Sequence, residues 1–225
     1  MFIERKPVGV YAANSYVVAP GESKEAAIID PGGEPEEIIK IIEDNGLEPK
    51  YIILTHGHGD HIYGLRELKE KYGIDVYIHE DDAELLEDPE KNLTAMMPVR
   101  EPMVFTDYKT FKDGDFLKLG DQNIKIIHTP GHTRGCVCLQ LGGSLFTGDT
   151  LFKGSIGRTD LYGGGDDIID SIREKLIRLD DNTRVFPGHG APTTMGLEKR
   201  VNPFVREAKQ PVKKKKRRMD NGDRF

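Results

Sequence analysis

Residues 55–61 crowd three histidines and an aspartate into one glycine-rich turn: His56, His58, Asp60 and His61. The turn follows the apolar run 51–54, which is typical of a buried strand, and precedes a helical pattern. Imidazole nitrogens and carboxylate oxygens are the ligands of zinc and neighbouring transition metals. The chain has only 7 histidines in 225 residues, so this density is not that of an ordinary polar loop. The stretch predicts a metal site held at a strand end by a rigid scaffold.

Composition favours one large domain with a real hydrophobic core, since 37% of the residues are hydrophobic and 31% charged. No apolar run approaches the roughly 18 residues of a membrane helix. Residues 1–6 lack the apolar segment of a signal peptide, so we expect a cytoplasmic protein with no membrane partner. Cys136 and Cys138 are two residues apart on a predicted strand, so their side chains point to the same face, which favours reduced, buried thiols over a disulfide.

Charge is unevenly distributed along the chain. The net charge is −6, yet residues 213–218 are all basic, so the remainder is more acidic still. An acidic body repels nucleic acid, and we expect no nucleic-acid partner. We interpret residues 1–207 as the catalytic domain and residues 208–225 as a basic, disordered tail, in preference to a nucleic-acid or membrane-binding segment.

Two halves of the chain repeat one pattern, strands first and then helices. In the first half, strands are predicted at 2–10, 14–19, 25–29, 51–54 and 76–78, and helices at 35–45 and 65–73. Residues 80–110 suggest a helix and then a long loop. In the second half, strands are predicted at 116–119, 124–128, 135–141, 145–147 and 185–186, and an amphipathic helix at 168–179. Two packed sheets with helices outside would bury this pattern.

Three more metal-ligand side chains follow predicted strands in glycine-flanked turns: His132, Asp149 and His189. We interpret the two remaining histidines, His79 and His128, as structural. The seven candidate ligands exceed the four that a tetrahedral zinc needs. They suit two metals roughly 3.5–4 Å apart that share a bridging carboxylate and a bridging hydroxide.

The ordered set formed by the His56–His61 motif, His132, Asp149 and His189 resembles the metallo-β-lactamase superfamily over residues 2–207. Residues 128–133, 148–152 and 154–160 are similar to the short, single-domain, glyoxalase II-like (hydroxyacylglutathione hydrolase-like) branch. The resemblance implies an α/β (α+β) fold, an αββα four-layer sandwich of two mixed β-sheets with helices outside and the site at one sheet edge.

The resemblance also implies a ligand scheme. His56, His58 and His132 would hold the first metal, Asp60, His61 and His189 the second, and Asp149 would bridge them. Zinc is the expected metal, although iron and manganese suit such ligands too. Asp60 and Asp149 are the catalytic candidates, Asp60 by orienting the nucleophile through a hydrogen bond. Asp30, at a strand end, is either a hydrogen-bond acceptor for a ligand histidine or a turn former.

The function implied is a dinuclear hydrolase that cleaves a small-molecule thioester such as S-lactoylglutathione. Two divalent cations lower the pKa of a shared water, so a hydroxide nucleophile exists near neutral pH. Too few residues follow His189 to form the helical glutathione-binding domain of the longer members. Four basic residues near the motifs are candidates for substrate contacts or for surface ion pairs: Arg134, Lys153, Arg158 and Lys199.

Other members of the superfamily supply the alternatives. A persulfide dioxygenase would use a single iron on His56, His132 and Asp149. A lactonase, or a phosphodiesterase or nuclease, is a further metallohydrolase alternative, although a nucleic-acid processing enzyme needs an RNA-binding arm that the sequence does not show. The flavodiiron branch typically has Glu where His58 stands, and a β-lactamase is disfavoured by the lack of a secretory signal.

Overall fold

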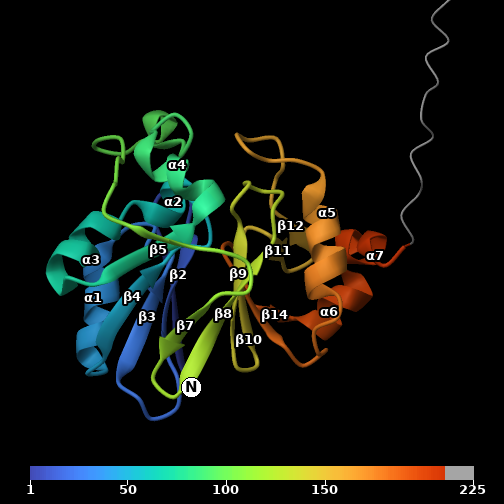
Figure 1. Ribbon diagram of the computed structural model, residues 1–225, viewed down its shortest axis with the longest axis horizontal. Helices are drawn as coiled ribbons and strands as arrows, with labels where there is room; N and C mark the ends of the chain where they lie inside the picture. Colours follow the sequence, from blue (N-terminus) through green and yellow to red (C-terminus); the bar gives the residue numbers. More distant parts are fainter. Residues whose placement is uncertain (211–225) are drawn as a thin grey trace, which may run out of the picture.

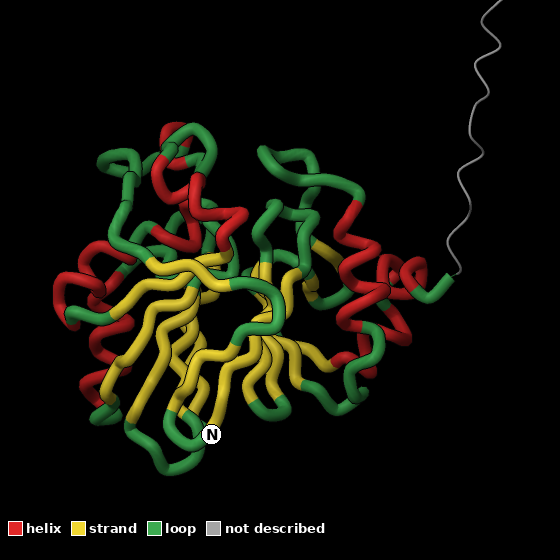
Figure 2. Tube along the Cα trace, in the orientation of Figure 1, coloured by secondary structure: helices red, strands yellow, loops and turns green. Residues whose placement is uncertain are grey.

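A computed structural model describes residues 1–210 as two packed, mixed β-sheets with helices on both outer faces (Figure 1). Figure 2 shows the strands gathered at the centre and the helices outside them. The predicted αββα sandwich is therefore confirmed. Of the tail predicted over residues 208–225, Ala208 ends the last helix of the described chain, and residues 211–225, which include the basic run 213–218, lie outside the described residues.

The first sheet has six strands that lie in sequence order. They are β1 (Phe2–Val8), β2 (Ala13–Ala19), β3 (Glu25–Ile29), β4 (Glu48–Ile53), β5 (Asp75–His79) and β6 (Lys109–Phe111). The first three are antiparallel, and β3 to β6 are parallel. Parallel neighbours need crossover connections, which here contain α1 (Pro35–Asp44), α2 (Gly59–Ile62) and α3 (Leu65–Tyr72).

The second sheet runs in the order β14-β13-β10-β9-β8-β7, and among its described strands only β10 and β13 pair in parallel. Its strands are β7 (Phe116–Leu119), β8 (Gln122–His128), β9 (Val137–Leu141), β10 (Ser144–Gly148), β13 (Arg184–Pro187) and β14 (Thr193–Thr194). Its outer face carries α5 (Asp167–Ser171), α6 (Met195–Val201) and α7 (Pro203–Ala208) (Figure 1). A small hairpin, β11 (Leu151–Phe152) with β12 (Ser155–Ile156), follows β10.

Alternation along the strands produces three apolar layers. On β2, Val17 faces the layer under α1 and α3, whereas Tyr16 and Val18 face the layer between the sheets. On β9, Leu139 faces the same central layer and Cys138 the third layer, under α5 and α7. Successive side chains of a strand point to opposite faces, so each sheet contributes side chains to two apolar layers. Both cysteine thiols are buried, as predicted.

The strands that carry the candidate ligands end at one edge of the sandwich. β3, β4 and β5 are parallel, and β8, β10 and β13 also run in one direction. The loops that follow these strands therefore meet where the two sheets adjoin. This is the edge at which α/β sheets bind ligands.

Several elements differ from the sequence prediction. Residues 80–110 contain η1 (Glu80–Asp82), α4 (Ala83–Glu87), η2 (Thr94–Met96) and the unpredicted strand β6. The helix predicted at 168–179 is α only to Ser171 and then makes a π turn, η3 (Ile172–Leu176), in which Ile177 N–H donates to Ile172 O at 3.0 Å. The wider turn is an i→i+5 bond that apolar periodicity does not reveal. Within residues 1–210, no helix is both long enough and apolar enough to cross a membrane.

Candidate metal centre

The histidine-rich turn begins where β4 ends and is tied to β3 through Asp30. The Asp30 carboxylate accepts hydrogen bonds from Thr55 N–H at 2.7 Å and from the Thr55 hydroxyl at 2.6 Å. A third contact joins the same carboxylate to His61 Nδ1 at 3.0 Å. Asp30 has the unfavourable left-handed backbone, φ 50°, held by a bond from Ser15 Oγ to its carbonyl. Of the two roles predicted for Asp30, the structure shows the acceptor role.

Each of three histidines has one ring nitrogen occupied by an acceptor outside the cluster. His61 Nδ1 faces Asp30, and His132 Nδ1 donates to the Arg158 carbonyl at 2.7 Å. The Thr55 hydroxyl gives its proton to Asp30, so its oxygen is the acceptor for His56 Nδ1 at 3.2 Å. Such contacts fix the tautomer, and all three leave the Nε2 lone pair facing inward.

His56, His58 and His132 form the first group of potential ligands, with donor atoms within 4.8 Å of one another. His58 Nδ1 lies 2.9 Å from His132 Nε2. Burial lowers the pKa of His58 to about 3, and burial also lowers the pKa values of His56 and His132. These imidazoles therefore stay neutral, which is the form that binds a metal.

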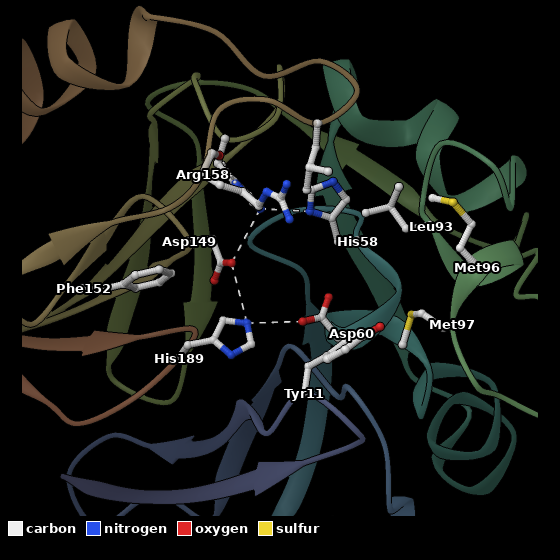
Figure 3. A pocket seen from close by; sticks show the side chains of 12 residues that line it. Tyr11, His58, Asp60, Leu93, Met96, Met97, Asp149, Phe152, Arg158 and His189 are labelled. Carbon is white, nitrogen blue, oxygen red and sulfur yellow. Dashed lines mark hydrogen bonds and ion pairs between the residues drawn. The ribbon is translucent and has the colours of Figure 1, made fainter.

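Asp60, His61 and His189 form the second group, again within 4.8 Å. His189 Nε2 lies 3.2 Å from Asp60 Oδ2 and 3.4 Å from His61 Nε2. Asp149 stands between the groups, with Oδ1 at 3.4 Å from His61 Nε2 and Oδ2 at 3.5 Å from His132 Nε2. Its Oδ2 also lies 3.6 Å from His189 Nε2 (Figure 3). The structure thus brings all seven predicted ligands together.

Two independent observations indicate that this set of donor atoms fits divalent cations. His56 Nε2 and Asp149 Oδ1 are buried and have no hydrogen-bond partner within residues 1–210, although such atoms are normally paired. Burial opposes a charge on His61, yet Asp60, Asp149 and Asp30 together raise its pKa to about 10. The carboxylates around the cluster therefore require positive charge, which metal ions would supply.

Packing around Asp149 leaves no room for larger loop residues. A Cβ on Gly188 would lie 2.3 Å from Asp149 Oδ1 and 2.7 Å from His61 Cε1. Since no real Cβ approaches so closely, only glycine brings the backbone before His189 against the other ligands.

A cavity of about 500 Å³ opens over these groups (Figure 3). Its lining includes His58, Asp60, His132, Asp149 and His189. The other lining residues are Tyr11, Leu93, Met96, Met97, Phe152, Arg158 and Leu161. A concave, largely apolar pocket with convergent polar groups at one side is typical of a small-molecule site.

Comparison with known proteins agrees with this geometry. The family model of the metallo-beta-lactamase superfamily matches residues 8–189. This chain belongs to the metallo-β-lactamase superfamily. Hydroxyacylglutathione hydrolase GloC of Haemophilus influenzae is 41% identical over 217 residues, which cover 91% of this chain and 98% of that protein.

Solved structures of the superfamily share the fold. BLEG-1, described as a B3 metallo-beta-lactamase, superposes with a TM-score of 0.85 at 36% identity, covering 91% of this chain and 99% of its own. TTHA1623, solved in a di-iron-bound form, gives a TM-score of 0.79 at 35% identity, covering 91% of this chain and 100% of its own. Membership in this superfamily supports a metal-dependent hydrolase.

Of the four basic residues predicted as candidates for substrate contacts, Arg158 lines the cavity. The other three are not among the described lining residues. Arg134 lies over the Tyr162 ring, and Lys153 is exposed. Lys199 Nζ instead donates to the Leu179 carbonyl at 2.6 Å and pairs with Asp181 at 2.7 Å. Its proximity to the motifs in sequence does not bring it to the site.

Asp82 is a buried residue that the sequence did not single out. Its carboxylate accepts hydrogen bonds from Gly57 N–H at 3.2 Å, Gly135 N–H at 2.6 Å and the Thr133 hydroxyl at 2.6 Å. Gly57 lies between two candidate ligands of the first half, and Thr133 follows His132 of the second. Asp82 therefore joins the ligand loops of the two halves. Its one sequence signal is its position just after β5, at the ligand edge.

Proposed function

We propose that this chain is a dinuclear metal-dependent hydrolase that cleaves thioesters, with S-lactoylglutathione as the reference substrate. The convergence of two ligand groups on Asp149, beneath a cavity, carries the proposal. The 41% identity to a protein named hydroxyacylglutathione hydrolase supports the thioester as the bond cleaved.

In the proposed scheme His56, His58 and His132 hold one metal, and Asp60, His61 and His189 hold the other. Asp149 contacts both groups and would bridge them. Bound divalent ions would supply Lewis acidity and a water of lowered pKa. Zinc is the first choice, and iron is supported by the di-iron form of TTHA1623.

Besides its contact with His189, Asp60 has a second proposed role, in orienting the attacking water. It borders the cavity, and although burial alone would raise its pKa, the charges of His61 and His189 hold that pKa below its ordinary range. Asp60 therefore remains ionised at neutral pH. An ionised carboxylate beside the cavity accepts a hydrogen bond from the attacking water and orients it.

Hydrolysis of a β-lactam is the second candidate, because BLEG-1 is described as a B3 metallo-beta-lactamase and is 36% identical to this chain. Both reactions place a carbonyl carbon over the same groups. A chromogenic cephalosporin therefore belongs in the same assay panel.

The test combines metal quantification with a substrate panel of S-lactoylglutathione, a chromogenic cephalosporin, a lactone and a phosphodiester. We expect about two metals per chain and thioester hydrolysis that is lost on chelation and regained with zinc, manganese or iron. One iron per chain, with oxygen consumption on glutathione persulfide, would support the persulfide dioxygenase and sink the hydrolase.

A further inference from the structure

One wall of the cavity is apolar and is formed by Leu93, Met96 and Met97 (Figure 3). Met96 is 70% exposed at the cavity, although large apolar side chains are usually buried. Tyr11 and Phe152 add aromatic surface elsewhere in the lining. An exposed apolar patch inside a pocket marks a place where apolar ligand surface is buried.

The wall is attached directly to the turn that carries the candidate ligands. Gly59 N–H donates to the Asn92 carbonyl at 2.7 Å. A Cβ on Gly59 would lie 2.4 Å from Thr94 Cγ2 and 2.6 Å from Met97 Sδ. Because Gly59 separates His58 from Asp60, the apolar wall stands at a fixed distance from both ligand groups.

Buried polar contacts hold the wall in shape. The fully buried Asn92 side chain donates to the carbonyls of Leu85 at 2.8 Å and Met103 at 3.0 Å. Its Oδ1 accepts from the Thr94 hydroxyl at 2.6 Å. Leu93, next in the chain, adopts the left-handed region at φ 71°, which is uncommon for a residue other than glycine. Strained backbone fixed by buried hydrogen bonds is characteristic of a built ligand surface.

The described part of the cavity lining offers few side-chain cations for the carboxylates of a thiol such as glutathione. Glutathione carries two carboxylates, and among the described lining residues Arg158 is the only lysine or arginine. Its guanidinium is already engaged by Asp160, with Nε–Oδ1 at 2.7 Å and Nη2–Oδ2 at 2.8 Å. Away from the candidate ligands, the described lining therefore offers apolar surface and no unengaged lysine or arginine for a carboxylate.

We propose that the preferred substrate is a thioester with an apolar arm that lies against Leu93, Met96 and Met97. This inference rests on the proposed thioester hydrolysis and names its substrate class. Two flexible methionines adapt to an unbranched chain. The arm belongs either to the acyl group or to the thiol, and paired substrate series distinguish the two.

The acyl series is butanoyl-, hexanoyl- and octanoylglutathione, whose carbonyls have equal intrinsic reactivity. The thiol series is the lactoyl thioesters of N-acetylcysteamine and N-octanoylcysteamine, whose thiols are alike. We expect kcat/KM to rise about tenfold from the shortest to the longest member of one series, because each buried methylene favours binding. The series that responds identifies which side of the thioester meets the wall.

Met96→Gln and Leu93→Asn test the wall itself. Glutamine keeps the length of methionine at an exposed site, and asparagine tolerates the left-handed backbone of Leu93. Each variant should lower the ratio of kcat/KM between long and short members about threefold or more. Val201→Gln, at an apolar side chain on α6 that is 54% exposed, is the matched control and should leave the ratio unchanged.

The outcomes separate the two proposals. Thioester hydrolysis with no dependence on chain length, or with ratios unchanged in both variants, would overturn the apolar-arm inference and leave thioester hydrolysis standing. A metal-loaded protein that cleaves none of these thioesters, S-lactoylglutathione included, would overturn the proposed function and with it the inference. A rising series whose slope falls in both variants supports both.

Discussion

The candidate metal centre and a separate stacked group, formed by His79, Asp81 and His128, lie at the ligand edge, and they differ in how their imidazole rings are oriented. In the candidate metal centre, the rings of His58 and His132 are 4.6 Å apart and nearly perpendicular, at 86°. In the stacked group, the two imidazoles lie 4.0 Å apart and nearly parallel, at 13°. Imidazole lone pairs lie in the ring plane, so those of parallel stacked rings cannot converge on one ion.

The nitrogens of the stacked group are also occupied differently. His79 Nδ1 accepts from the Asp81 N–H at 3.2 Å, and His128 Nε2 contacts the Arg134 carbonyl at 2.8 Å. In the candidate metal centre, His56, His61 and His132 each have Nδ1 engaged by an acceptor outside the cluster, so that Nε2 faces inward. Closeness of histidines is therefore not enough for a metal site, because the partner of the second nitrogen decides where the lone pair points.

The largest expected effect is at the residue shared by both ligand groups. Asp149→Ala removes the carboxylate between His61 and His132, so the chain should lose bound metal and about 10³-fold in activity. Metal content and kcat/KM measure this directly. Two metals and full activity in this variant would refute the ligand scheme.

Asp30, the hydrogen-bond acceptor for His61 Nδ1, should affect metal binding less than a metal ligand does, but still measurably. Asp30→Asn keeps the shape but weakens the acceptor for His61 and Thr55, so metal affinity should fall about 10–100-fold. Competition with a chelator gives the affinity. Asp81→Asn, in the stacked group, is the matched control and should change nothing; equal effects at both positions would mean that the two sites do not differ in metal binding.

The residue that joins the two halves should affect stability. Asp82→Asn replaces an acceptor of three hydrogen bonds with a group that donates, so we expect the free energy of unfolding to fall by about 1–3 kcal/mol. A denaturant titration of the metal-free chain measures the change. An unaltered midpoint would mean that Asp82 does not hold the ligand loops together.

The smallest effect is expected in the stacked group. His128→Gln should leave metal content and activity unchanged and alter stability by less than about 1 kcal/mol, because His128 is a partly exposed residue outside the candidate metal centre. Loss of one equivalent of metal in this variant would show that stacking does not prevent coordination.

The sequence predicted those features that depend on local pattern. The apolar pattern of the sequence predicted most strands of both sheets, and the turns after these strands contain the seven candidate ligands. The acceptor role of Asp30 was foreseen as one of two possibilities because it follows a strand. Asp82 was missed because two of its three partners are backbone N–H groups of distant glycines, which leave no mark in the sequence.

Features set by tertiary contact were beyond the sequence pattern. The apolar wall of residues 93–97 depends on the buried contacts of Asn92 and Thr94. The strand β6 is only three residues long and, within residues 1–210, pairs with β5 alone. The placement of Lys199 follows from the turn after η3, whose free carbonyl at Leu179 accepts its ammonium.

The hydrogen bond between Gly59 and Asn92 joins the wall to the ligand turn, so the surface residues of the wall can be varied in protein engineering. Asn92 and Thr94 supply the attachment, Met97 both packs against Gly59 and lines the cavity, and Leu93 and Met96 supply surface alone. A library randomised at Leu93 and Met96, with the other three residues kept, would explore new substrate preferences without rebuilding the ligand turn. Randomising all five would mix changes in selectivity with loss of the metal centre.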